Sequence, residues 1–221
     1  MKADRRLRLA VLISGTGSNL KALIDARDSG RLAIDIVQVI SNRVTAPGLD
    51  HARAAGIPVA VIDRANAGPH GEDHAVAERL RGLSPDLVLL SGYMRIVGAP
   101  LIEAFDGRMI NQHPSLLPKY KGLDTYQRVL EAGDPEHGAS VHFVTAQLDG
   151  GPVIAQLRVP VRTHDTPASL AACLGPLEHQ LLVAVMELFA ARRVEMRDGK
   201  ACLDGQALAQ ALQWHEGRLH A

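Results

Sequence analysis

The fold of this chain is decided by one short stretch, LAVLISGTGSN at residues 9–19. Its five leading apolar residues are typical of a strand buried on both faces, as in parallel sheets. The glycines end that strand, and apolar residues then recur at helical spacing from Leu20. We expect Ser18 or Asn19 to cap the helix. The stretch therefore predicts a strand, a glycine loop and a helix, the unit from which α/β sheets are built.

The glycine loop indicates a binding site for phosphate. A helix that starts after such a loop presents free backbone N–H groups and the positive end of its dipole. Leu20 stands where a dinucleotide-binding loop has its third glycine, and no acid follows the next predicted strand to hold a ribose. We interpret the loop as a site for the terminal phosphate of a small substrate. The alternative is a tight turn without a ligand.

The strand and helix pattern continues along the chain and predicts a doubly wound α/β fold, with a mostly parallel sheet and helices on both faces. Strands are expected at 9–13, 34–40, 58–62, 87–90, 139–144 and 153–161, and helices at 48–55, 71–83, 124–132 and from 166 through 189. A hairpin is expected at 194–203, turning near Asp198-Gly199. We expect one domain over residues 1–221, with a short disordered N-terminus and a surface helix and frayed end at 205–221.

Composition excludes several classes of function. Lys+Arg and Asp+Glu both number 24, and aromatic residues make up only 3%, so neither a basic surface nor a base-stacking surface for nucleic acid is expected. No run of apolar residues approaches the ~18 needed to span a membrane. Cys173 and Cys202 lie far apart, which fits a reducing cytoplasm and suggests neither a disulfide framework nor a zinc site.

A second stretch, MINQHPSLLP at residues 109–118, carries the candidate chemistry. Alternation along a strand turns Asn111 and His113 to the same face, and Pro114 ends the strand. An amide and an imidazole would then face outward together at a strand end, where open α/β sheets keep their ligand crevices.

Asp149 lies in a separate glycine-rich turn and supplies a carboxylate for the same site. A neighbouring carboxylate favours the cationic form of His113, which could then act as a general acid or stabilise an oxyanion together with the Asn111 amide. No serine or cysteine is placed as a nucleophile, so direct attack of a substrate amine on a carbonyl is favoured. Taken singly, His113 could be structural and Asp149 a turn former. The histidines are scattered, and no metal site is expected.

Five motifs in this order resemble the phosphoribosylglycinamide formyltransferases, the folate-dependent enzymes of purine synthesis. They are SGTGSNL at 14–20, GYMRI at 92–96, NQHPSLLP at 111–118, VHFV at 141–144 and LDGGPVI at 148–154, and the resemblance covers nearly all of residues 8–205. It implies transfer of the formyl group of 10-formyltetrahydrofolate, a co-substrate, to the amine of 5-phospho-ribosylglycinamide.

The resemblance also implies roles for individual residues. Asn111, His113 and Asp149 match the family's catalytic triad. The phosphorylated substrate is implied to meet Gly17, Ser18, Asn19 and Glu178, and the folate to meet Met94, Arg95, Ile96, Val97, Asn111, Thr145, Ala146, Gln147, Leu148 and Asp149. The implied partners are small molecules, with no nucleic acid or membrane, and the implied state is a cytoplasmic monomer or homodimer.

The chain departs from the family pattern in three places. Residues 65–78 contain no Lys or Arg, although bacterial members often have an arginine there that meets the folate. Tyr126 replaces a frequent histidine, and Gly175-Pro176 should kink the last long helix. Rival readings are another user of 10-formyltetrahydrofolate, either the hydrolase or the methionyl-tRNA formyltransferase, and a catalytically inactive binding module.

Overall fold

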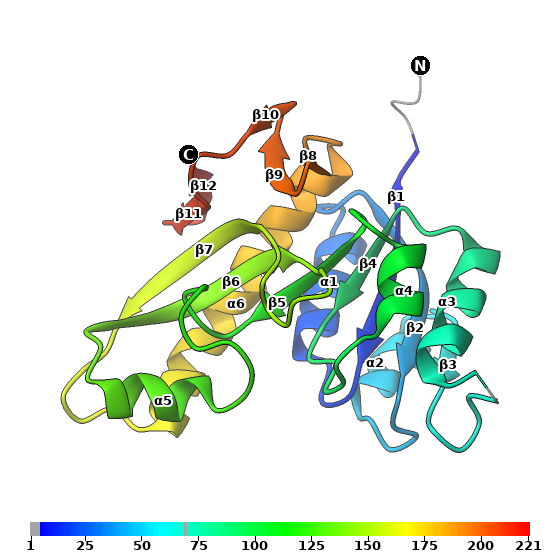
Figure 1. The fold of residues 1–221 in the computed structure, drawn as a ribbon, viewed down its shortest axis with the longest axis horizontal. Coiled ribbons are helices and arrows are strands. Elements are labelled where there is room, and N and C mark those ends of the chain that lie inside the picture. Colours follow the sequence, from blue (N-terminus) through cyan, green and yellow to red (C-terminus); the bar gives the residue numbers. More distant parts are fainter. Residues whose placement is uncertain (1–4, 69) are drawn as a thin grey trace. The chain divides into compact units, whose positions relative to one another are not determined.

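The computed structural model describes residues 5–68 and 70–221, and the chain divides into two compact units at residues 110 and 111 (Figure 1). The start of the N-terminal segment expected to be disordered, residues 1–4, lies outside the described residues. The prediction of a single domain stays a prediction.

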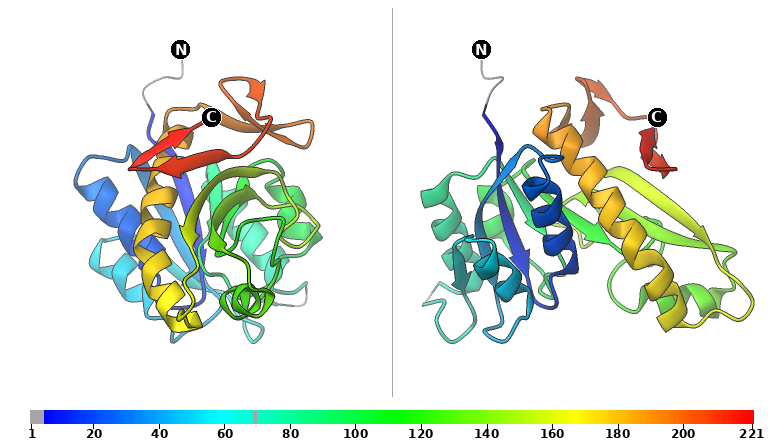
Figure 2. Two further views of the ribbon diagram at one scale, coloured as in Figure 1. Left: turned by 90° about the vertical axis from the view of Figure 1, so that its left-hand side faces the viewer. Right: turned by 180° about the vertical axis from the view of Figure 1, so that it is seen from behind.

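The first unit is a parallel sheet covered by helices. Its strands are β1 (Leu7–Ile13), β2 (Ile34–Ser41), β3 (Val59–Val61) and β4 (Leu87–Leu90), in the order β3-β2-β1-β4. Its helices are α1 (Ser18–Asp28), α2 (Gly48–Ala54), α3 (Glu72–Leu83) and α4 (Ala99–Ala104). Helix α1 packs beside α2 and α3 beside α4, and Figure 1 with the right-hand view of Figure 2, from behind, shows these pairs on opposite faces of the sheet. The predicted doubly wound α/β pattern is confirmed.

Strand β1 forms the centre of this unit because it is apolar throughout its second half. Leu9 to Ile13 are completely buried, and β1 pairs in parallel with both β2 and β4. Parallel pairing places the carboxyl ends of β1 and β4 at the same edge of the sheet, so the loops that follow Ile13 and Leu90 lie side by side. The backbone N–H of Ser14 donates to the carbonyl of Gly92 across this edge.

The second unit begins within β5 (Met109–His113), and the last three residues of this strand belong to it. Its further elements are α5 (Thr125–Ala132), β6 (Glu136–Phe143), β7 (Val153–Pro160), α6 (Pro167–Ala190), β8 (Val194–Arg197), β9 (Lys200–Leu203), β10 (Gln206–Ala207), β11 (Leu212–His215) and β12 (Arg218–His220). Strands β6 and β7 are antiparallel, β11 runs parallel to β7, and β12 returns antiparallel to β11. Strands β8 to β10 form a separate small sheet.

Helix α6 supplies much of the core of the second unit. Thr166 caps it together with Ser169 in a reciprocal pair of hydrogen bonds, and Pro167 stands in the first turn, as expected. The helix continues through Pro176, and the expected kink stays a prediction. Its mean hydropathy of 1.3 over an 18-residue window and its length would suffice to cross a membrane, but its apolar residues pack against β6 and β7.

Two local predictions are wrong. Neither Ser18 nor Asn19 caps α1, because Gly17 is the N-cap in a left-handed conformation, with φ of 70°. The tail at 205–221 contains the strands β10 to β12 and no helix. Glu216-Gly217 has positive φ at both residues, which is the geometry of a two-residue hairpin turn and explains why the chain reverses there.

Candidate active site

Strand β5 presents Asn111 and His113 on one side and Gln112 on the other. Gln112 donates from Nε2 to the backbone carbonyl of Glu178 at 2.9 Å, which ties β5 to α6. His113 is 6% exposed, and its Nε2 lies 2.9 Å from the carbonyl oxygen of Tyr120. Because a carbonyl oxygen only accepts hydrogen bonds, this contact places the ring proton of His113 on Nε2. Nδ1 is then the nitrogen left to exchange a proton.

Asp149 joins these side chains from the turn between β6 and β7. Its Oδ2 lies 3.6 Å from Nδ1 of His113 and accepts the backbone N–H of Gly122 at 2.8 Å. Its Oδ1 accepts from Nδ2 of Asn111 at 3.5 Å. Asp149 has φ of 44°, so its backbone is held in the left-handed region that most residues avoid. The structure thus brings together the three residues that the sequence singled out.

His142 is a fourth member of this cluster, which the sequence reasoning missed. It stands on β6, is 2% exposed, and donates from Nδ1 to the carbonyl of Phe143 at 2.8 Å. Its Nε2 can therefore accept the Nδ2 hydrogen of Asn111 at 3.2 Å, and it lies 3.6 Å from Oδ1 of Asp149. His142 fixes the orientation of the Asn111 amide. Its place in an alternating strand next to the glycine-rich turn was the available signal.

The charges of this cluster differ from the expectation for His113. Burial lowers the pKa of His113 and outweighs the Tyr120 carbonyl and the Asp149 carboxylate, which raise it. The prediction of a favoured cationic His113 is therefore wrong for the protein without a ligand. Burial also raises the pKa of Asp149, but the adjacent His142 ring, the hydrogen bond from the Gly122 N–H and the nearby His113 outweigh burial and lower this pKa to about 2. The site thus pairs a neutral imidazole with an ionised carboxylate.

The glycine loop belongs to the first unit. Gly17 approaches Gly48 so closely that a Cβ on Gly17 would lie 2.7 Å from the Cα of Gly48, and Gly17 is the left-handed N-cap of α1. No side chain caps this helix, which leaves first-turn N–H groups available to a ligand. Ser18 is exposed beside them, and Oδ1 of Asn19 is buried without a partner.

The loop after β4, also in the first unit, exposes apolar side chains. Met94 is 61% and Ile96 71% exposed, and the backbone N–H of Met94 donates to Oγ of Ser14 at 2.8 Å. The side chain of Arg95 is instead held at 3.0 Å by Glu72 and at 2.6 Å by Asp73, two acids at the start of α3. Sequence reasoning noticed that this helix start lacks a basic residue but missed its two acids. Val97 is partly buried in the same loop.

The turn before Asp149 also lies open to solvent in the second unit. Leu148 is 47% exposed, and Ala146 and Gln147 are exposed beside it, while Thr145 is partly buried. Such exposed apolar residues suit the edge of a site for a flat ligand. No group of three or more His, Cys, Asp or Glu side chains that could hold a metal ion occurs in residues 5–68 and 70–221.

Glu178 is the acid that α6 contributes to the second unit. Burial raises its pKa to about 7. Burial raises the pKa of Tyr126, and the Glu178 carboxyl group raises it further. The Tyr126 ring contacts the His137 ring edge-on, with ring centres 5.1 Å apart. Glu178 therefore lies in a poorly solvated environment that favours its neutral form up to about pH 7.

Comparison with known proteins defines the class. Residues 7–186 match the family model described as formyl transferase, which is most of the chain. The chain therefore belongs to the formyl transferase family.

Individual relatives narrow this assignment. The chain is 44% identical to the phosphoribosylglycinamide formyltransferase of Haemophilus influenzae over 92% of this chain and 97% of that protein. It is 43% identical to the Escherichia coli enzyme of the same name, over 91% and 96% of the two chains. The solved phosphoribosylglycinamide formyltransferase of Coxiella burnetii superposes with a TM-score of 0.90 at 42% identity, covering 96% of this chain and 100% of that one. Within the family, the chain groups with the phosphoribosylglycinamide formyltransferases.

A more distant structure represents the rival activity. A formyltetrahydrofolate deformylase from Pseudomonas syringae superposes with a TM-score of 0.82 at 26% identity, and the match covers 91% of this chain and 67% of that one. The same fold thus also occurs in an enzyme whose name describes deformylation. The choice between transfer and deformylation rests on the much higher identity to the formyltransferases.

Proposed function

We propose that this enzyme transfers the formyl group of 10-formyltetrahydrofolate to the amine of 5-phospho-ribosylglycinamide, in purine synthesis. The observation that supports this best is the cluster of Asn111, His113 and Asp149, because it joins an amide donor, a neutral imidazole and an ionised carboxylate within 3.6 Å contacts. Like its relatives, the enzyme acts on small molecules.

The proposed chemistry is direct attack of the substrate amine on the formyl carbon. A new C–N bond forms, and the carbonyl electron pair moves to the oxygen. Nδ1 of His113 accepts a proton from the attacking amine, and Asp149, 3.6 Å from Nδ1, stabilises the resulting imidazolium. The imidazolium and the Nδ2 hydrogen of Asn111 then stabilise the tetrahedral oxygen. The proton passes to N10 of the folate as the bond from the formyl carbon to N10 breaks, so that no proton is gained or lost overall.

The binding residues follow from the exposed groups in each unit. The first-turn N–H groups of α1 at Gly17, Ser18 and Asn19 suit the substrate phosphate. Glu178 suits the polar part of the same substrate. The folate is proposed to contact Met94, Arg95, Ile96, Val97, Asn111, Thr145, Ala146, Gln147, Leu148 and Asp149, of which Met94, Ile96 and Leu148 are exposed apolar residues.

We also propose that the enzyme works in the cytoplasm as a monomer or homodimer, without nucleic acid or membrane partners. The formal net charge of zero supports the absence of a nucleic-acid partner, because phosphate backbones are bound through a basic surface. Cys173 and Cys202 are both free, which suits a reducing compartment.

A transfer assay tests the proposal. Purified protein is mixed with 5-phospho-ribosylglycinamide and a 10-formyl folate, and the folate absorbance is followed. His113→Ala should abolish transfer and leave the circular dichroism spectrum unchanged, whereas His164→Ala, at an exposed position, serves as the matched control. Normal turnover by His113→Ala would contradict the proposed role. Equal consumption of folate without the amine would instead show a deformylase.

A further inference from the structure

The loop between β5 and α5 provides two backbone groups to the proposed catalytic cluster. The carbonyl of Tyr120 meets Nε2 of His113 at 2.9 Å, and the N–H of Gly122 donates to Oδ2 of Asp149 at 2.8 Å. The loop is conformationally demanding, since Tyr120, Gly122 and Asp124 have φ of 53°, 79° and 58°. Side chains other than glycine adopt this left-handed region at a cost of about 1 kcal/mol or more. Some other contact must therefore hold the loop in place.

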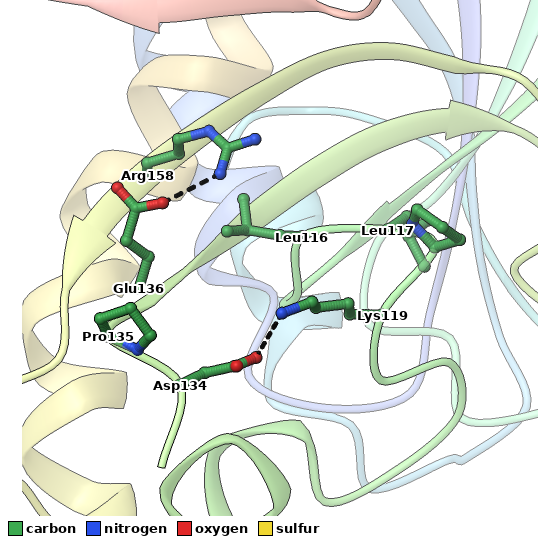
Figure 3. A pocket seen from close by; sticks show the side chains of 8 residues that line it. Leu116, Leu117, Lys119, Asp134, Pro135, Glu136 and Arg158 are labelled. Atoms are coloured by element: carbon green, nitrogen blue, oxygen red, sulfur yellow. Dashed lines mark hydrogen bonds and ion pairs between the residues drawn. The ribbon is translucent and has the colours of Figure 1, made fainter. Parts of the chain in front are cut away.

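One side of the loop borders a pocket. A pocket of about 250 Å³ lies behind it and is lined by Leu116, Leu117, Pro118, Lys119, Asp134, Pro135, Glu136 and Arg158 (Figure 3). The charged side chains around the pocket are joined in ion pairs, Lys119 with Asp134 at 2.7 Å and Arg158 with Glu136 at 3.1 Å. Because the loop borders open volume on this side, polar contacts contribute to holding its conformation.

Two side chains on or directly after α5 make polar contacts to the loop, in addition to the hydrogen bond from the Ser115 hydroxyl to the carbonyl of Lys119 at 2.7 Å. Asp134 accepts the hydroxyl hydrogen of Tyr120 at 2.6 Å and the ammonium of Lys119 at 2.7 Å, both on Oδ2. Arg128 donates from one nitrogen to the carbonyl of Lys121 at 2.6 Å and to that of Leu123 at 3.3 Å. Its guanidinium also lies over the Tyr120 ring, 5.4 Å from the ring centre. Every loop residue from 119 to 121 thus has a contact with Arg128 or Asp134.

We propose that Arg128 and Asp134 are positioning residues for the formyl transfer proposed above, because they hold Tyr120 and Gly122 where these fix the tautomer of His113 and the carboxylate of Asp149. The inference rests on that proposed function for its effect on activity, but its structural part does not. With the loop held, the proton of His113 stays on Nε2 and Nδ1 stays free beside Asp149. With the loop released, Nε2 loses its acceptor and the two tautomers become closer in energy.

Nitrogen NMR of the histidine rings tests this directly, because it distinguishes a protonated ring nitrogen from an unprotonated one. The signals of His113 are assigned from their absence in His113→Ala. We expect Arg128→Met to convert His113 from the Nε2–H tautomer into a mixture, and Arg128→Lys to restore part of the wild-type signal. Arg158→Met is the matched control, because Arg158 borders the same pocket but pairs with Glu136.

Kinetics give the second measurement. Arg128→Met and Asp134→Asn should lower kcat by about 10- to 100-fold, since misplacement of a reacting group by about 1 Å has an effect of this size. KM should stay within roughly twofold, because no substrate contact is removed. Glu136→Gln is the control for Asp134→Asn. Unchanged His113 signals in both Arg128→Met and Asp134→Asn would overturn the inference, whatever the activity. Loss of activity with an unchanged tautomer would also overturn it, because it would show a merely structural effect.

The two proposals fail in different ways. If His113→Ala stays active, the proposed function of His113 is wrong, and the tautomer of His113 in Arg128→Met still decides the structural part of the inference. If His113→Ala is inactive while Arg128→Met and Asp134→Asn match the wild type in kcat and tautomer, only the inference is wrong.

Discussion

Replacing Glu178 with glutamine should make the protein more stable at alkaline pH but not at acid pH. Burial raises the pKa of Glu178 from its ordinary 4.5 to about 7. The neutral carboxyl group is therefore preferred in the folded state, and ionisation above pH 7 opposes folding. Glutamine keeps the shape of the neutral acid and cannot ionise, so it removes this effect.

The magnitude follows from the size of the rise. At ~1.4 kcal/mol per pKa unit, a rise from 4.5 to about 7 corresponds to about 3 kcal/mol as an upper limit. Glu178 is only half-buried, and solvent screening should reduce this to about 1–2 kcal/mol. For a carboxyl group whose folded-state pKa is raised, the favourable contribution is complete below pH 4.5 and is lost as the pH rises through about 7. The advantage of Glu178→Gln should therefore be near zero at pH 4.5 and reach its full size by pH 8.

Urea unfolding followed by tryptophan fluorescence measures this difference. Trp214 is the single tryptophan and lies in β11, in the same unit as Glu178, so its signal reports on the relevant part of the chain. Glu103→Gln, at an exposed position on α4, serves as the control and should show no pH-dependent gain. A gain for Glu178→Gln that is equal at pH 5 and pH 8 would refute the reasoning, because it would not come from ionisation. A raised KM in the same variant would support the proposed substrate contact.

Three further changes test other parts of the structure. Asp149→Asn should lower the pKa of His113 further, since the carboxylate raises it, and so move the acid limb of the pH–rate profile to lower pH; an unchanged limb would show that the two groups are not coupled. His137→Phe should lose up to about 3 kcal/mol less free energy of unfolding than the wild type when the pH is lowered. Burial and His113 lower the pKa of His137 from 6.5 to about 4, so the wild type loses stability as the pH falls through this range, whereas phenylalanine cannot be protonated. Urea midpoints at pH 5 and pH 7.5 measure this, and a constant difference between them would contradict it. Gly48→Ala should destabilise the first unit by about 1–3 kcal/mol, because its Cβ would lie 2.8 Å from Cδ1 of Ile13 and 2.9 Å from Cα of Gly17, whereas Gly15→Ala meets nothing within 4 Å and is the control in a thermal melt.

The arrangement of the sheet in the first unit was predictable because its signals are local. Continuous apolar runs such as Leu87–Leu90 and Leu9–Ile13 mark strands buried on both faces, and the structure has strands there. The missed elements had weaker signals. Helix α4 is only six residues long and carries Pro100 in its first turn, and no sustained periodicity fits into so short a segment.

The tail from 205 to 221 shows a different kind of error. Its strands β10 to β12 are two to four residues long, too short for alternation to exceed chance. The better signals were Asp204-Gly205 and Glu216-Gly217, pairs that adopt positive φ at both positions and reverse the chain. The same kind of pair, Asp198-Gly199, did lead to the correct prediction of the β8–β9 hairpin.

In the candidate site, the sequence predicted side chains better than it predicted their environment. That Asn111 and His113 share a face follows from the alternation of a strand, and the carboxylate of Asp149 was expected beside them from its glycine-rich turn and from the resemblance of the motifs. The carbonyl of Tyr120 and the N–H of Gly122 could not be predicted, because they depend on loop dihedral angles that no residue pattern specifies. The direction of the His113 pKa shift was wrong for the same reason, since it depends on how much solvent the fold excludes.

The short contact between β11 and β7 covers part of an edge of the sheet in the second unit. Leu212 and Gln213 pair with Ala155 and Gln156, and so occupy backbone groups on the outer side of β7. Without β11, that side of β7 would offer open N–H and C=O groups to any other extended chain, which is the usual starting point of strand-to-strand aggregation. Strands β11 and β12 thus move the free edge of the sheet from the eight-residue β7 to the three-residue β12, and so short an edge strand is a poor template for pairing.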